Sequence, residues 1–344
     1  MKILIIRFSS LGDVILTTSV PAFLKAKYPG CQVHFATKIQ FSDILQGNPD
    51  IDCIFTLEKN SESNFLKQIQ KEQPYDLIID LHASLRSRMI CFKIEHKKLR
   101  RFKKPYLKRF LLVICKINLL KNHPDVATRY LMAAGASRAE AESLTLKKQR
   151  IFTDDDDTSI FEQTAPKPVL ALAPGSQWFT KKWPSASFAK LLELLEFNYP
   201  KQFQYILLGS KNEEADAQDI LNRLPDSFAA RIHNLTGQTS LRQTANILSQ
   251  TQIFVCNDSG LMHLAAAFDT YILAIFAATV PELGFLPPSK NFSLLQNRVP
   301  CAPCSPKGRP SCPKKHFRCA LELKPQAVFQ AVQKVISQSH FSGG

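Results

Sequence analysis

The sequence has no hydrophobic run long enough to cross a bilayer. Its most apolar stretch, FLLVICKINLL at 110–120, is well short of the roughly 20 apolar residues that a membrane helix needs, and it contains a lysine. The N-terminal run MKILIIRF carries one lysine and no cleavage site, which indicates a buried strand and not a signal peptide. With 45% hydrophobic and 21% charged residues, the chain is predicted to be soluble and globular.

Several binding motifs are also missing. No predicted strand is followed by G-x-G-x-x-G, which argues against a dinucleotide-dependent oxidoreductase. No zinc-finger or RNA-recognition motif accompanies the net charge of +15, so nucleic acid is not the expected partner. The excess of basic residues therefore predicts one of two other partners, an anionic membrane surface or a phosphorylated substrate.

Acidic residues are almost absent from the region 86–121. Thirteen Lys and Arg stand there against the single acid Glu95, and apolar residues such as Phe102, Tyr106 and Phe110 are interleaved with them. This combination is typical of a surface helix lying against anionic headgroups, where each basic residue contributes about 1 kcal/mol. A solvated basic helix face is the alternative.

Short apolar runs alternate with amphipathic stretches in both halves of the chain. KILIIRF, QVHFAT, DCIFTL and YDLIIDLH come first, and PVLALAPG, FQYILLGS, QIFVCNDSG and YILAIFA come later. Apolar strands separated by helices predict parallel sheets that are covered on both faces. The segment 144–168, with an acidic run and two prolines, has the composition of a linker. We therefore expect two α/β domains that bind their ligands at the strand ends.

The run ALAPGS, which ends a predicted strand, is followed by QWFTKKWP. Ser176 offers a hydroxyl at this strand end, and Lys181 and Lys182 supply positive charge. Small residues and lysines are suited to a diphosphate, because a lysine stabilises the charge that develops on the leaving oxygen. An ordinary loop with surface lysines is the alternative.

The segment NDSGLMHLAAA follows another predicted strand. Ser259 and Gly260 present backbone N–H groups to a pyrophosphate, and Asp258 caps the helix or orients a substrate hydroxyl. His263 either donates to a phosphate or is a packing residue.

A third strand end carries an acid, Glu213, four residues after Gly209. A carboxylate beyond a glycine turn is suited to bridging ribose hydroxyls, although a helix-initiating acid has the same pattern. The turn after the first strand, SSLGD, likewise ends in a carboxylate, Asp13, where an anion-binding turn would not be expected to have one.

Four of the nine cysteines lie within nineteen residues near the C-terminus. Cys301, Cys304, Cys312 and Cys319 have the spacing C-x2-C-x7-C-x6-C. A leading CxxC in a loop of this kind is typical of a structural zinc site. Disulfides and unpaired thiols are the alternatives.

Five segments in order along the chain resemble bacterial lipopolysaccharide heptosyltransferases, glycosyltransferase family 9. They are SSLGD, DLHASLRS at 80–87, PGS followed by KKWP, NDSGLMHLAAA and the cysteine segment. The resemblance implies a GT-B fold, in which two Rossmann-like doubly wound domains face each other across a cleft. The acceptor domain is expected at 1–150, a linker at 151–168 and the nucleotide-sugar domain at 169–324. A C-terminal helix at 325–338 is expected to cross back to the N-terminal domain.

The resemblance also implies a reaction, the inverting transfer of a heptose from ADP-L-glycero-D-manno-heptose to a lipid A–core acceptor. Asp13 matches the general base and Lys181 the catalytic lysine on the donor phosphates. The expected donor-binding residues are Ser176, Gln177, Lys182, Gly209, Glu213, Asp258, Ser259, Gly260 and His263, and the expected acceptor-binding residues are Ser10, Gly12, Arg86 and Arg88. No D-x-D pair stands in either strand-end turn, so no metal is expected to take part in catalysis.

A base in the acceptor domain accounts for the acid in the SSLGD turn. Asp13 belongs to the other domain from the phosphate contacts, so it need not repel the donor, and general-base catalysis is typically worth roughly 10²–10⁴-fold in rate. An acidic glycolipid acceptor accounts for the basic region, and the protein is expected to be cytoplasmic and peripheral on the inner membrane. The alternatives are a nucleotide-sugar epimerase, a transferase with another donor, and a non-catalytic protein that binds membranes or nucleic acid.

Overall fold

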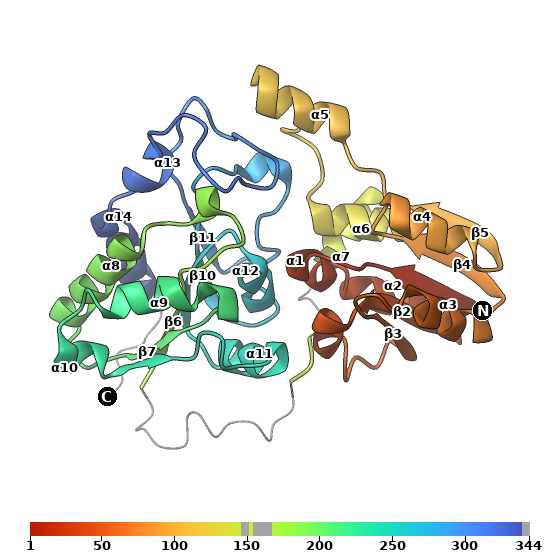
Figure 1. The fold of residues 1–344 in the computed structure, drawn as a ribbon, viewed down its shortest axis with the longest axis horizontal. Coiled ribbons are helices and arrows are strands. Elements are labelled where there is room, and N and C mark those ends of the chain that lie inside the picture. The colour runs from red at the N-terminus through yellow and green to blue at the C-terminus, as the bar shows by residue number, and fades with distance from the viewer. Residues whose placement is uncertain (146–150, 154–166, 339–344) are drawn as a thin grey trace. The chain divides into compact units, whose positions relative to one another are not determined.

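The computed structural model describes residues 1–145, 151–153 and 167–338 and divides into two compact units (Figure 1). Unit 1 is formed from Met1–Tyr106, Asn122–Thr153 and Gly284–Pro288. Unit 2 is formed from Leu107–Lys121, Asp154–Leu283 and Ser289–Gly344. Most of the predicted linker 151–168, including its acidic run, lies outside the described residues.

Unit 1 is built on a five-stranded parallel sheet in the order β3-β2-β1-β4-β5. The strands are β1 (Lys2–Ile6), β2 (Gln32–Lys38), β3 (Cys53–Leu57), β4 (Tyr75–Asp80) and β5 (His96–Arg101). Ile3 and Ile5 of the central strand join one hydrophobic cluster, and Leu4 and Ile6 join another. Because successive side chains of a strand point to opposite faces, both faces of the sheet are buried, as the continuous apolar runs predict.

Helices cover this sheet. They are α1 (Leu11–Ile15), α2 (Ser19–Lys27), α3 (Glu62–Lys71), α4 (Leu85–Phe92), α6 (Val126–Ala134) and α7 (Arg138–Thr145), with a 3-10 helix at Ile39–Ile44. Residues of α2 and α6 bury side chains in the cluster around Ile3 and Ile5, while α3 and α4 contribute to the cluster around Leu4 and Ile6. Helices on both faces of a parallel sheet give a doubly wound α/β unit.

Unit 2 repeats this architecture on a six-stranded parallel sheet in the order β11-β10-β9-β6-β7-β8. The strands are β6 (Val169–Ala173), β7 (Gln204–Leu207), β8 (Ile232–Asn234), β9 (Ile253–Asn257), β10 (Tyr271–Ile275) and β11 (Phe292–Leu295). The helices are α8 (Ser185–Asn198), α9 (Glu214–Leu221), α10 (Asp226–Ala229), α11 (Leu241–Ser249), α12 (Gly260–Ala265), α13 (Arg318–Leu321) and α14 (Pro325–Gln338).

The C-terminal helix α14 has the predicted bounds but not the predicted partner. Its buried side chains Val328, Phe329, Val332 and Val335 belong to the core of unit 2, and the helix packs against α8 and β10. The expectation that it crosses to the N-terminal domain is therefore corrected. The chain instead returns to unit 1 at Gly284–Pro288, where the Gly284 carbonyl accepts a hydrogen bond from the Val126 N–H at 3.0 Å.

The basic region 86–121 is not a single surface helix, and that interpretation is also corrected. It contains α4, the edge strand β5, the short helix α5 (Tyr106–Phe110) and a π-helical turn (Leu111–Cys115). β5 forms because its backbone pairs with β4, although its sequence HKKLRR is almost wholly basic. Leu112 and Val113 are buried, and the segment from Leu107 onwards belongs to unit 2 and not to the N-terminal domain. No helix among the described residues is long and apolar enough to span a bilayer.

Candidate functional site

In unit 1, the turn after β1 places the Asp13 carboxylate among donor groups from three residues. The Ser10 N–H and hydroxyl donate to Asp13 Oδ2 at 3.2 and 2.9 Å, and the Arg7 guanidinium pairs with the same oxygen at 2.5 Å. The Tyr130 hydroxyl, from α6, donates to Oδ1 at 2.7 Å. The side chain of Asp13 is 15% exposed, so the carboxylate is held in place yet still accessible.

These contacts keep Asp13 ionised. Burial by itself raises the pKa of the carboxyl group, but the Arg7 guanidinium and the hydrogen bonds from Tyr130 and Ser10 outweigh it and lower the pKa to about 2. Arg7 is itself fixed, because its Nη1 donates to the Leu81 carbonyl at 2.7 Å. The group can therefore accept a hydrogen bond or a proton from a bound hydroxyl across the physiological pH range.

The other expected acceptor residues have different surroundings. Gly12 is buried in α1 beside Asp13, and Ser10 is exposed at the start of this helix. Arg86 and Arg88 are exposed on α4, where the Arg86 guanidinium lies 4.0 Å from the Glu62 carboxylate. The structure thus brings Ser10 and Gly12 to Asp13, while the two arginines lie on the outward side of a neighbouring helix.

In unit 2, Asn257 joins the ends of β6 and β9. Its Nδ2 donates to the Pro174 carbonyl at 2.6 Å, and its Oδ1 accepts from the Trp183 N–H at 2.9 Å. Trp183 is buried, and its ring N–H donates to the Leu323 carbonyl at 2.9 Å. The loop between Pro174 and Trp183 is therefore anchored at both ends.

This anchored loop carries Lys181, whose Nζ lies 2.8 Å from Asp258 Oδ2. The Thr279 hydroxyl donates to the same carboxylate oxygen at 2.7 Å, and the Ser176 hydroxyl lies 3.5 Å from the Asp258 carbonyl oxygen. The Lys181 side chain is 16% exposed and that of Asp258 is 7% exposed. The pair places one ammonium group, with restricted motion, at the ends of β6 and β9.

Two other residues of the loop are placed differently. Lys182 turns to α9, where its Nζ lies 2.6 Å from Asp216 Oδ2, and Gln177 is exposed. The neighbouring lysines thus have separate partners. Of the two, Lys181 is the one that lies with Asp258 and Ser176.

The Glu213 side chain packs against Gly175 and Gly209, which follow the neighbouring strands β6 and β7. Its Oε2 accepts from the Ser210 N–H and hydroxyl at 2.7 and 3.0 Å. A Cβ on Gly175 would lie 2.2 Å from the Glu213 carboxyl carbon, and a Cβ on Gly209 would lie 3.1 Å from Oε2. A side chain at Gly175 would therefore displace this carboxylate from its present position.

The segment after β9 carries the remaining predicted donor-binding residues. Ser259 precedes α12, Gly260 is its first residue, and both are partly exposed. His263 is buried, with an exposed fraction of 3%, inside this short helix. Among the described residues the Ser259 hydroxyl has no hydrogen-bond partner although it is buried. The structure therefore gathers Ser176, Lys181, Asp258 and Ser259 at neighbouring strand ends of unit 2.

Sequence reasoning missed four residues that hold these groups. Arg7 and Tyr130 hold Asp13, while Asn257 and Thr279 hold the loop and Asp258. Asn257 lies next to Asp258 in a motif that was already singled out, so its strand-end position was a usable signal. Tyr130 is 117 residues from Asp13, and nothing in the local sequence marks that contact.

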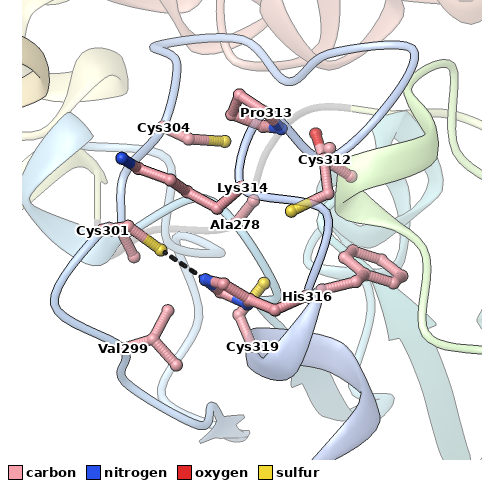
Figure 2. Close-up of a pocket in the computed structure, with 12 residues that line it drawn as sticks. Ala278, Val299, Cys301, Cys304, Cys312, Pro313, Lys314, His316 and Cys319 are labelled. Atoms are coloured by element: carbon pink, nitrogen blue, oxygen red, sulfur yellow. Dashed lines mark hydrogen bonds between the residues drawn. The ribbon is translucent and has the colours of Figure 1, made fainter.

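The four C-terminal cysteines line one small pocket together with His316 (Figure 2). All four are free thiols, and Cys301 Sγ lies 3.5 Å from His316 Nε2. Burial, with the neighbouring thiols adding, raises the pKa of Cys319 to about 11. No three Cys, His, Asp or Glu side chains in the described part of the chain are already placed to hold a metal ion. The pocket brings the predicted ligands together, and the zinc itself stays a prediction.

Three known proteins show what this chain is similar to. Lipooligosaccharide heptosyltransferase 2 of Haemophilus influenzae is 27% identical over 84% of this chain and 86% of its own length. Escherichia coli ADP-heptose LPS heptosyltransferase II has a TM-score of 0.77 at 21% identity, over 98% of this chain and 99% of that one. E. coli heptosyltransferase WaaC, solved with ADP, has a TM-score of 0.68 at 18% identity, over 97% and 100%.

These structural similarities confirm the predicted GT-B fold, with its two parallel-sheet α/β domains. The match to a sequence-family model goes further, because it covers most of the chain, residues 64–315. The model describes glycosyltransferase family 9 (heptosyltransferase), so the chain is a glycosyltransferase and belongs to that family.

Proposed function

We propose that the protein transfers a heptose from ADP-heptose to the inner core of lipopolysaccharide with inversion at the anomeric carbon. Family membership supports glycosyl transfer. The names of the similar proteins support the finer statement, since they are heptosyltransferases of lipooligosaccharide or lipopolysaccharide and one was solved with ADP. The acceptor is proposed to be lipid A–Kdo or a heptosylated core.

The observation that carries the proposal is the Asp13 carboxylate held by Arg7, Ser10 and Tyr130. In the proposed step an acceptor oxygen attacks the anomeric carbon, and the C–O bond to the diphosphate breaks with its electron pair leaving on ADP. The acceptor proton passes to Asp13 Oδ1, which accepts only the Tyr130 hydrogen bond within the described chain. Because a carboxylate with a low pKa is a weak base, this proton moves late, when the forming bond has made the hydroxyl acidic.

Unit 2 is proposed to bind the donor. Lys181 would offset the negative charge that develops on the leaving diphosphate, and Asp258 with Thr279 restricts the lysine to one position. The buried Ser259 hydroxyl has no hydrogen-bond partner among the described residues, and the Ser176 hydroxyl donates to the Asp258 carbonyl over a long 3.5 Å. Both are proposed to donate to phosphate oxygens when the donor binds. Glu213, fixed by Ser210, is suited to the ribose hydroxyls. On this proposal the charge stabilisation comes from a lysine and no metal ion is required.

The proposed acceptor is an acidic glycolipid of the cytoplasmic leaflet, so we propose that the protein is cytoplasmic and associates peripherally with the inner membrane. The exposed basic residues of 86–121, such as Arg88, Lys93 and Lys108, support this, because positively charged surfaces are attracted to anionic lipids.

A thermal-shift panel with ADP, UDP, GDP, NAD and ADP-heptose, with and without Mg²⁺, tests the donor. A ligand at a hundred times its dissociation constant adds about 2.7 kcal/mol of stability, which is readily measured. Stabilisation by ADP and ADP-heptose alone, unaffected by Mg²⁺, is expected and would lead to assays with truncated lipid A acceptors. Preference for UDP would overturn the ADP-heptose donor while leaving the family intact.

A further inference from the structure

Helix α4 of unit 1 exposes an apolar stripe that nothing in the described chain covers. Leu85, Met89 and Phe92 are 76%, 52% and 92% exposed. Their spacing of i, i+4 and i+7 places them on one face of the helix. The opposite face is buried, since Ile90 and Cys91 belong to the core of the unit. An eight-residue helix that is apolar on both sides is unusual for a free surface, where large exposed apolar patches mark interaction sites.

Positive charge borders this stripe. Arg88 is exposed on α4, and Lys93, the residue directly after the helix, is exposed as well. Glu95 is the single acid between Leu85 and Arg101. The exposed face therefore combines three large apolar side chains with a basic border.

We propose that this face of α4 docks on an anionic lipid bilayer, with Leu85, Met89 and Phe92 inserted at the headgroup boundary and Arg88 and Lys93 near the lipid phosphates. Apolar side chains beside lysine and arginine are the combination that binds amphipathic surfaces to anionic membranes. A protein partner fits less well, because lysine is depleted in protein–protein interfaces. The inference deepens the proposed function, since it names the surface that meets the membrane.

The orientation of α4 is fixed by the buried carboxylate of Asp80 at the end of β4. Asp80 Oδ2 accepts from the Ser87 hydroxyl and from Arg101 Nε, both at 3.0 Å, and Oδ1 accepts from the Ala83 N–H at 2.8 Å. These bonds tie the first turn of α4 to β4 and β5. The stripe is therefore presented by a rigid element and not by a loose loop.

The segment that follows β4 is also hydrogen-bonded to the end of β1, next to the Asp13 turn. The Leu81 and His82 N–H groups donate to the Ile6 carbonyl at the end of β1, and Arg7, which pairs with Asp13, donates to the Leu81 carbonyl. α4 begins four residues after Leu81. A membrane held by α4 would thus lie next to the strand ends to which an embedded acceptor must come.

Protection of the sheet edge does not explain the stripe. β5 is an edge strand, and lysines such as Lys98 on it discourage pairing with other sheets. Leu85, Met89 and Phe92, however, lie on a helix, where no edge needs protection. In unit 2, the segment after β5 shows the same combination: Leu107, Phe110, Ile114, Ile117 and Leu119 are each at least 50% exposed among basic residues.

The test is flotation of the full-length protein with vesicles of phosphatidylcholine alone or with 30% phosphatidylglycerol, in the absence of substrates. We expect binding to the anionic vesicles only. Leu85→Ser/Met89→Ser/Phe92→Ser should weaken it at least tenfold, whereas Phe197→Ser, which removes an equally exposed phenylalanine from α8, should change it less than twofold. Arg88→Gln/Lys93→Gln should weaken it about 30-fold at low salt, and Lys67→Gln/Lys71→Gln on α3 should not.

Equal binding to both vesicles, or α4 variants that bind like the wild type, would overturn the inference. Melting temperatures of all variants show whether they fold, and Phe92→Ser alone is the milder change if the triple variant does not. Transfer to a delipidated, water-soluble acceptor is measured separately and should be unchanged in the apolar α4 variants. If the wild type lacks this transfer yet binds anionic vesicles through α4, the proposed function fails and the docking surface stands.

Discussion

At the scale of single residues, the structure explains how an acid can be retained in a turn that otherwise suits an anion. Asp13 is neutralised by Arg7 and oriented by Tyr130 and Ser10. The sequence singled out this acid, whose role as the base is a proposal, but two of the three residues that hold it were not identified. A contact between residues 13 and 130 depends on the packing of α6, which no local pattern encodes.

Replacing Asp13 by asparagine is expected to lower kcat by roughly 10²–10⁴-fold, because the amide cannot take the acceptor proton. ADP affinity should stay within about twofold of the wild type, since the proposed donor residues belong to unit 2. Asp226→Asn, an exposed carboxylate on α10, serves as the matched control and should leave kcat unchanged. An Asp13→Asn protein that folds and retains full kcat would contradict the assignment of the base.

The low pKa of Asp13 also predicts how stability depends on pH. The pKa is 3.8 for the unperturbed group and about 2 in the folded chain, so ionised Asp13 stabilises the fold above about pH 4. This contribution, about 2 kcal/mol, is lost as the pH falls from about 4 to about 2. Denaturant unfolding of the wild type and Asp13→Asn between pH 6 and 2 should show their difference in stability shrinking over that range. A difference that does not change with pH would contradict the ion pair with Arg7.

At the scale of the elements, the prediction succeeded where strands are buried on both faces. The runs around β1, β4, β6 and β9 are continuously apolar, which is what a central parallel strand requires. β5 was missed because HKKLRR has no apolar periodicity, and its strand conformation comes from pairing with β4. Edge strands bury little side-chain surface, so their sequences carry little of the signal that prediction uses.

The strand end of β6 depends on the absence of a side chain at Gly175. In Gly175→Ala the new methyl group would overlap the Glu213 carboxylate, which is the flexible end of its side chain and can move away. We therefore expect the melting temperature to fall by only a few degrees, while ADP binding weakens about tenfold because the displaced carboxylate loses its ribose contact. Isothermal titration calorimetry measures this, with Ser227→Ala at an exposed position of α10 as the stability control. Unchanged ADP affinity would argue against a role of Glu213 in ribose binding.

For the cysteine loop we propose one structural zinc ion per chain, held by Cys301, Cys304, Cys312 and Cys319. The thiols line one pocket, and a cation would allow them to lose their protons despite their burial (Figure 2). Metal analysis of the purified protein should find about one zinc per chain, lost in Cys304→Ser but kept in Cys115→Ser, an exposed cysteine outside the loop. Protein free of metal with nine titratable thiols would contradict this proposal.

At the scale of the whole molecule, the two units are not simple halves of the chain. Leu107–Lys121 lies within the N-terminal half of the sequence but belongs to unit 2, and Lys116 donates to the Cys301 and Pro303 carbonyls at 2.7 and 2.8 Å. Gly284–Pro288 makes the opposite exchange and joins unit 1. Such exchanges depend on tertiary contacts between distant segments, so composition alone placed the boundary at a single linker.

This division into units predicts where a nucleotide protects the backbone from hydrogen exchange. If unit 2 binds the donor, ADP should slow exchange at the strand ends around 174–183, 208–214 and 257–263, by up to about 100-fold at a hundred times its dissociation constant. The turn at 7–13 in unit 1 should exchange at the same rate with and without ADP, because its proposed partner is the acceptor. Hydrogen-exchange mass spectrometry with ADP, and with GDP as the control nucleotide, measures both regions in one experiment. Protection of residues 7–13 equal to that of the unit 2 segments would contradict the division of donor and acceptor between the units, whereas protection confined to unit 2 would support it independently of any activity measurement.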